Sequence, residues 1–232
     1  MKKTTEIIIV LDRSGSMSSI RKETISGFNE FLSKQKEENP DSLITMVQFD
    51  HRYFPIYEAE PTKRALPLDN KSFVPAGMTA LLDAIGKTIK KVVKRHKKLN
   101  EDERPGKVLF VIITDGYENS SVKYNREKIF NKIRKMEEKH GWEFVYLGAN
   151  QDAIHEAANF GISEKKAMTF AYDSLGMQDA FMSLSNNIIS FSKSEKIFEF
   201  SDEERAKHNR TDGRKNKSNI DPMNFRTDIF DL

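Results

Sequence analysis

Five side chains that carry oxygen stand in three short stretches far apart in the chain: Asp12, Ser14, Ser16, Thr79 and Asp115. Carboxylate, hydroxyl and water oxygens suit a hard cation, and Mg2+ usually takes only one or two carboxylates. Three of the five ligands would be neutral hydroxyls, so the two carboxylates would balance the ion's charge and leave it attractive to another acidic oxygen. The set predicts a Mg2+ or Mn2+ site, with Ca2+ as an alternative, that binds an Asp or Glu of a partner protein.

Two buried strands are expected to position these side chains. Residues 6–11 and 108–114 are nearly continuous runs of apolar and β-branched residues, which is typical of central parallel strands covered on both faces by helices. Asp12 and Asp115 follow these runs. In open parallel sheets, ligands bind beyond the carboxyl ends of the strands, where the chain connections diverge. We therefore expect both carboxylates at one edge of the sheet.

The whole pattern predicts an α/β fold: an open, mostly parallel six-stranded sheet with one antiparallel edge strand and helices on both faces. An edge position for residues 53–57 accommodates Pro55, because Pro cannot donate a hydrogen bond to a neighbouring strand. The expected strands are 6–11, 43–49, 53–57, 108–114, 142–147 and 167–172, and the expected helices are 20–37, one that starts at 79, 125–140, 153–160 and 175–191. One domain would span 1–198, and a basic, flexible tail with an apolar end would span 199–232.

The spacing Asp12-x-Ser14-x-Ser16, the Thr79 loop and Asp115 together resemble the metal-ion-dependent adhesion site of von Willebrand factor A domains. This resemblance covers roughly residues 5–195 and implies a Rossmann-like fold. It also implies that the three hydroxyls reach the metal, and that the two carboxylates act directly or through water. The last coordination position would be left for a partner's carboxylate. The chain closely resembles the small standalone bacterial and bacteriophage members, and the family implies a binding module and not an enzyme.

Helix capping is the competing interpretation of the first motif. Asp and Ser after strands also serve as helix N-caps, and Ser16 or Ser18 would suit a helix that begins near residue 20. The convergence of three stretches favours the metal site. The neighbouring residues Tyr117, Glu118, Asn119 and His51 are predicted to form the rim that contacts the partner.

Two further functions stay open from the sequence. A metal-dependent phosphate-ester hydrolase would need a base near the ion, and His51 is the histidine expected at that edge. An RNA-binding protein would use the basic face of residues 87–98, although a solvated helix face explains those lysines equally well. The net charge of +3 gives no argument for nucleic acid from the protein as a whole.

Composition bounds the compartment. The chain of 232 residues has no Cys, no apolar run of transmembrane length and no cleavage pattern of a signal peptide at its start. We therefore expect a soluble cytoplasmic protein that does not bind membranes, and the family resemblance implies a bacterial or phage origin.

Overall fold

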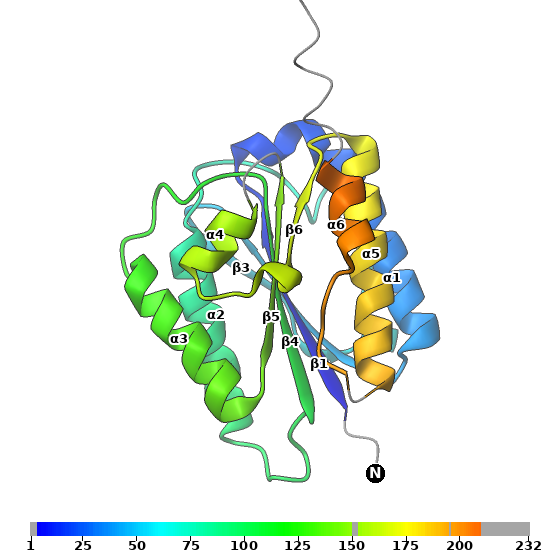
Figure 1. Cartoon of the computed structure of the whole chain (residues 1–232), viewed down its shortest axis with the longest axis vertical. Helices are drawn as coiled ribbons and strands as arrows, with labels where there is room; N and C mark the ends of the chain where they lie inside the picture. The colour runs from blue at the N-terminus through cyan, green and yellow to red at the C-terminus, as the bar shows by residue number, and fades with distance from the viewer. Residues whose placement is uncertain (1–3, 150–152, 195, 210–232) are drawn as a thin grey trace, which may run out of the picture.

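A computed structural model describes residues 4–149, 153–194 and 196–209, and its centre is one mixed sheet (Figure 1). Six strands lie in the order β3-β2-β1-β4-β5-β6, and only β3 runs antiparallel to its neighbour. The fold class predicted from the sequence is confirmed. The strands are β1 (Thr5–Asp12), β2 (Leu43–Phe49), β3 (Tyr53–Pro61), β4 (Lys107–Thr114), β5 (Glu143–Ala149) and β6 (Ala167–Phe170).

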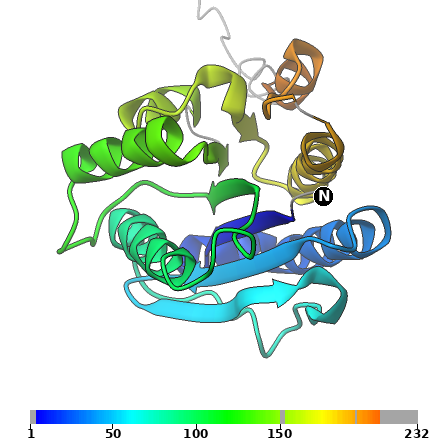
Figure 2. The ribbon, with the colours of Figure 1, turned by 90° about the horizontal axis from the view of Figure 1, so that it is seen from below.

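Helices cover both faces of the sheet (Figure 2). On one face α1 and α5 pack together over side chains such as Ile7 and Leu109, and on the other α2 and α3 cover Ile8 and Phe110. Alternate residues of each central strand thus enter two separate cores, which explains why these strands are apolar throughout. The helices are α1 (Arg21–Glu38), α2 (Leu81–His96), α3 (Arg126–His140), α4 (Ala153–Asn159), α5 (Ser174–Lys193) and α6 (Asp202–Asn209), with 3-10 turns η1 (Gly15–Ile20), η2 (Thr62–Arg64) and η3 (Glu164–Lys166).

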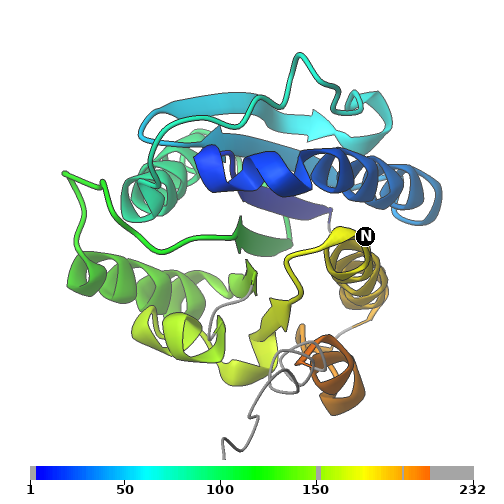
Figure 3. The same ribbon diagram turned by 90° about the horizontal axis from the view of Figure 1, so that it is seen from above.

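The chain connections diverge between β1 and β4, the two central strands. From β1 the chain crosses to β2 on one side, whereas β4 leads to β5 on the other. Viewed from above, η1 and the connection after β4 lie at the carboxyl ends of these strands (Figure 3). A crevice at such a switch point is the usual ligand site of an open α/β sheet. The fold therefore brings the ends of β1 and β4 together, as the sequence predicted.

Element ends follow from local chemistry. The side chain of Asn125 accepts a hydrogen bond from the backbone N–H of Lys128 and caps α3. Gly141 ends the same helix with φ 61°, a left-handed conformation that glycine adopts without strain. The first long helix differs from the expected 20–37, because a 3-10 turn precedes it and α1 begins at Arg21.

Residues 197–209 pack more closely than we expected. Phe198 and Phe200 are buried in the core on the α1 and α5 face, and α6 contacts β6. The backbone N–H of Phe200 also donates to the carbonyl of Lys165. Residues 199–209, which we expected to begin a flexible tail, thus continue the domain. The remainder of that segment, 210–232, lies outside the described residues.

No helix in the described ranges combines the length and the apolar character needed to cross a bilayer.

Candidate metal centre

Hydrogen bonds connect the first and third sequence stretches. The hydroxyl oxygens of Ser14 and Ser16 lie 3.0 Å apart, and the Ser16 hydroxyl donates to Asp115 Oδ1 at 2.7 Å. Ser14 and Ser16 come from the turn after β1, whereas Asp115 follows β4. Side chains that are about a hundred positions apart in the sequence therefore share one site.

Asp12 lies beneath these hydroxyls and is fully buried. Its Oδ1 accepts the backbone N–H of Ser14 at 2.6 Å, and its Oδ2 accepts the hydroxyl of Thr114 at 2.6 Å. Both donors are neutral. The carboxylate is therefore held in one orientation, but no charge compensates it.

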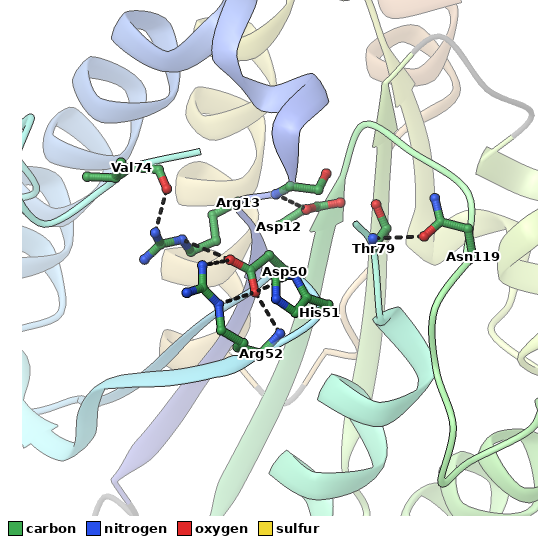
Figure 4. A network of polar contacts seen from close by, with 9 residues as sticks. Asp12, Arg13, Asp50, His51, Arg52, Val74, Thr79 and Asn119 are labelled. Atoms are coloured by element: carbon green, nitrogen blue, oxygen red, sulfur yellow. Dashed lines mark hydrogen bonds and ion pairs between the residues drawn. The ribbon is translucent and has the colours of Figure 1, made fainter. Parts of the chain in front are cut away.

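The Thr79 loop closes the site from a third direction. The backbone N–H of Gly15 donates to the carbonyl of Gly77 at 2.9 Å, and Asn119 Oδ1 accepts the backbone N–H of Thr79 at 2.9 Å. A Cβ built on Gly116 would lie 3.6 Å from Thr79 Oγ1 and 3.8 Å from Ser16 Oγ. The hydroxyls of Thr79 and Ser16 thus both lie next to Gly116, and Figure 4 shows Asp12 and Thr79 facing the same space.

Gly77 explains how this loop approaches so closely. Its φ is +78°, and any Cβ at that position would collide with the imidazole ring of His51. Only glycine fits both conditions without displacing neighbouring groups.

The two carboxylates of the site repel each other. Burial, partly offset by the hydrogen bonds from Thr114 and Ser14 and reinforced by the charge of Asp115, raises the pKa of Asp12 from 3.8 to about 7. Burial also raises the pKa of Asp115, although the Ser16 hydroxyl opposes that shift. Oδ2 of Asp115 is buried and has no hydrogen-bond donor among the described residues. The site therefore holds excess negative charge and an unmatched oxygen.

Arg13 stands between Asp12 and Ser14 in sequence, yet it does not neutralise the site. Its Nε lies 3.9 Å from Asp50 Oδ2 (Figure 4). Its guanidinium group also stacks over the Phe54 ring, 4.2 Å from the ring centre. The backbone turns this cation toward the neighbouring strand. Asp50, which is also held by Arg52 at 2.8 Å, thereby receives the cations that Asp12 lacks.

Helix capping does not account for the serine hydroxyls. Ser14 occupies the N-cap position of η1, but its side chain makes no capping hydrogen bond. The N-cap residue of α1 is Ile20, so neither Ser16 nor Ser18 caps that helix. Ser16 directs its hydroxyl to Asp115 instead. The geometry therefore does not support helix capping as the role of these serines.

The four predicted rim residues divide into two kinds. Glu118 and Asn119 hold the loops together, since the Glu118 carboxylate accepts backbone N–H groups including that of Leu82, and Asn119 binds Thr79. Tyr117 is 58% exposed and extends from the surface. His51 is exposed and lies 3.5 Å from Asp50. Contact with a partner stays a prediction for all four.

Two residues that the sequence did not single out belong to the site. Thr114 positions Asp12, and its signal was a polar residue that ends an otherwise apolar strand. Tyr172, which follows β6, donates its hydroxyl to the carbonyl of Ser16 and accepts the Ser19 hydroxyl. No local pattern marks Tyr172, because only the fold brings residue 172 beside residue 16.

These residues fit a divalent cation by their chemistry. No group of three or more His, Cys, Asp or Glu side chains within the described part of the chain is arranged to hold a metal. A cation here would depend on the hydroxyls of Ser14, Ser16 and Thr79 in addition to the two carboxylates. A cation would interact with the buried Asp115 oxygen that has no hydrogen-bond donor. It would also relieve the repulsion between the two carboxylates.

Comparisons with known proteins agree with this architecture. The profile of the von Willebrand factor type A domain matches residues 6–182. Among solved structures, the manganese-loaded TRAP protein of Plasmodium vivax is similar with a TM-score of 0.54 and 15% identity, over 79% of this chain and 74% of that one. The von Willebrand factor domain of the type V pilus tip protein Mfa5 from Porphyromonas gingivalis has a TM-score of 0.56 and 9% identity, over 85% and 99%.

Other similar structures are longer than this chain. A von Willebrand factor type A protein from Catenulispora acidiphila has a TM-score of 0.51 and 14% identity, and the match covers 81% of this chain. The chain spans 43% of that protein and 45% of the ArnB paralog VWA2 from Sulfolobus acidocaldarius. At these identities the likeness concerns the fold. A search of the curated proteins finds no match.

Proposed function

This chain belongs to the von Willebrand factor type A domain family, and from that premise we propose that it is a non-enzymatic module that binds an acidic side chain of another protein. Domains of this family are generally metal-dependent protein-interaction modules. The proposed ligands of a Mg2+ or Mn2+ ion are Asp12, Ser14, Ser16, Thr79 and Asp115.

A single observation carries this proposal. Among the described residues four acidic side chains are buried, namely Glu6, Asp12, Asp50 and Glu156. Three of them form ion pairs with Arg or His, and Asp12 forms none. An isolated buried carboxylate is costly, so a cation that is not part of the polypeptide is the expected partner of Asp12.

The chain's own residues define what such a site selects. Asp12 is fixed by Ser14 and Thr114, so the site is preformed and needs little rearrangement. With two carboxylates and three hydroxyls, a bound divalent ion keeps affinity for a further anionic oxygen. Ser16 is exposed, which leaves the site open to another protein.

Two similar structures support the assignment by what their names state. One is a manganese-loaded protein, and another is a domain of a pilus tip protein. The first bears on the metal and the second on interaction between proteins. A hydrolase is the alternative, and no hydrogen bond or ion pair of the described structure joins His51 to Asp12 or Thr79.

Calorimetric titration with Mg2+ and Mn2+ tests the metal site directly. Ser16→Ala removes one proposed ligand and should weaken metal binding by about tenfold, the loss of one good contact. Ser18→Ala is the matched control, because Ser18 is exposed in the same turn and is not a proposed ligand. Equal metal affinity of both variants would refute the ligand set.

A peptide with one Glu among Gly and Ser residues then tests carboxylate capture. Its binding, followed by backbone amide shifts in NMR spectra, should require Mg2+ or Mn2+ and disappear in EDTA. Binding that persists unchanged in EDTA would reject the mechanism. Turnover of a phosphate ester with Mn2+, abolished by Asp115→Ala, would establish the hydrolase instead.

A further inference from the structure

A cavity lies beside the candidate metal centre, between the start of α2 and the loop that precedes α3. It has a volume of about 400 Å3 and is open to solvent. We call it the basic pocket and define it by the residues His51, Arg52, Tyr53, Lys87, Lys90 and Lys123. Its size falls within the range of cavities that hold small ligands or side chains.

Positive charge in the basic pocket exceeds negative charge. Asp83 is the acidic residue in its lining, against three lysines. Arg52 is already paired with Asp50 at 2.8 Å, whereas no ion pair of the described chain involves Lys87, Lys90 or Lys123. Burial and then the charges of Lys91 and Lys123 lower the pKa of Lys87. The lining of the pocket therefore carries more positive than negative charge.

The walls of the pocket are held in place by the fold. The Asp83 carboxylate accepts the backbone N–H groups of Val122, Lys123 and Tyr124 at 2.9 to 3.2 Å, which fixes the loop that carries Lys123. The ammonium group of Lys87 lies 4.0 Å from the centre of the Tyr53 ring. A cation over an aromatic face is directed by that ring and keeps its charge available to a ligand.

The basic pocket and the metal centre share one wall. Ala80 lines the pocket and directly follows Thr79. His51 lines it too, and its ring packs against Gly77 in the loop that presents Thr79. Figure 4 shows His51 between the charged cluster around Asp50 and the Thr79 loop. A bound segment of extended chain could therefore contact both sites at once.

We propose that the basic pocket binds a second acidic side chain of the same partner segment whose first carboxylate occupies the metal centre. This proposal rests on the proposed function and adds a selectivity rule, namely that preferred partners carry two acidic residues close in sequence. Two linked contacts bind more tightly than either alone, because the second becomes intramolecular. Opposite charge also favours the encounter.

An acidic protein segment fits better than a nucleic acid. The lysines converge on one hollow next to a centre that would itself bind a carboxylate. A nucleic acid needs a longer basic track along its backbone. On α2 that track is interrupted, because Arg95 is paired with Glu6 at the far end of the helix.

The test compares peptides that contain one Glu with peptides that contain two, separated by increasing numbers of Gly and Ser residues. In Mg2+ the best two-Glu peptide should bind at least about tenfold more tightly than the one-Glu peptide. Lys87→Gln with Lys123→Gln should abolish this difference and leave Mg2+ affinity unchanged. The matched control is Lys94→Gln with Lys98→Gln, which removes two exposed lysines outside the pocket.

Measurements in EDTA separate this inference from the metal proposal. Two-Glu peptides should still shift the amide signals of Lys87 and Lys123, because the pocket needs no metal. Equal affinity for one-Glu and two-Glu peptides in Mg2+, without such shifts in EDTA, would overturn the second site and leave the first intact. A one-Glu peptide that ignores Mg2+ would instead reject the metal proposal. A single-stranded RNA that binds more tightly than the two-Glu peptides, through Lys87 and Lys123, would reassign the pocket to nucleic acid.

Discussion

The two ends of β1 each bury an acidic side chain, and they treat it in opposite ways. At the start of the strand, Glu6 is paired with Arg95, lies 2.7 Å from His96 Nε2 and accepts the Thr45 hydroxyl at 2.7 Å. Burial alone would raise its pKa, but these partners lower it below its ordinary value. At the end of the strand, Asp12 has only neutral donors, and its pKa is raised to about 7.

This difference separates a structural acid from one kept for a ligand. Glu6 carries its counter-charges within the chain, so its burial requires no cation from outside the polypeptide. Asp12 is as deeply buried, yet the adjacent Arg13 turns to Asp50. Functional sites are commonly places where local stability is reduced. The carboxyl end of β1 fits that rule, and the opposite end does not.

The largest expected effect is a pH dependence that belongs to Asp12. In EDTA, a proton stays on folded Asp12 up to about pH 7 but leaves the unfolded chain near 3.8. The folding stability that this raised pKa contributes is therefore fully present below pH 3.8, and it is lost as the pH rises through 7. Asp12→Asn, which resembles the protonated acid, should gain at most about 4 kcal/mol over wild type between pH 4 and pH 8. Urea unfolding at a series of pH values measures this gain.

Saturating Mg2+ provides the control for that experiment. It should stabilise wild type at pH 8 and cancel the advantage of Asp12→Asn, because binding to the folded state alone adds stability. An advantage of Asp12→Asn that stays constant from pH 4 to pH 8 would show that the carboxylate is not destabilised by burial.

The second prediction removes the counter-charge at the other end of the strand. Arg95→Ala leaves Glu6 buried with His96 as its remaining cationic partner, and should cost about 3 kcal/mol in the free energy of unfolding. Mg2+ should not restore this loss, because Glu6 is far from the proposed ligands in the sheet. Lys94→Ala, an exposed neighbour on α2, is the matched control. Recovery of Arg95→Ala by Mg2+ would break the contrast between the two ends.

Strand identity and the position of the site could be predicted from sequence for one physical reason. Residues 6–11 and 108–114 are apolar throughout because both faces are covered, and parallel strands place the residues that follow them at one edge. The ligand assignment of Asp12 and Asp115 nevertheless remains a prediction. What the structure adds is the pair of contacts between the two segments: Ser16 donates to Asp115, and Thr114 donates to Asp12.

Other features had no local signal. The direction in which the Arg13 side chain points depends on a neighbouring strand and the turn after the second strand, since its cationic group contacts Phe54 and Asp50. The packing of Phe198 and Phe200 depends on an apolar surface built by distant elements, whereas the surrounding charged residues suggested a tail. Tertiary contacts of this kind override local composition.

The smallest predicted effect concerns Tyr172, which joins the turn after β1 to the end of β6. Tyr172→Phe removes the hydroxyl that contacts the Ser16 carbonyl, Ser19 and the Asp115 carboxylate, and keeps the ring. Ser16 would then be held less firmly, so Mg2+ affinity should fall roughly two- to fivefold, as for a lost hydrogen bond of about 0.5 to 1 kcal/mol. Tyr117→Phe is the control, because Tyr117 is also close to the site but 58% exposed. Calorimetric titration with Mg2+ compares the two variants. An equal effect of both would mean that Tyr172 does not position Ser16. The difference between the two ends of β1 would then not depend on the contact with the residue that follows β6.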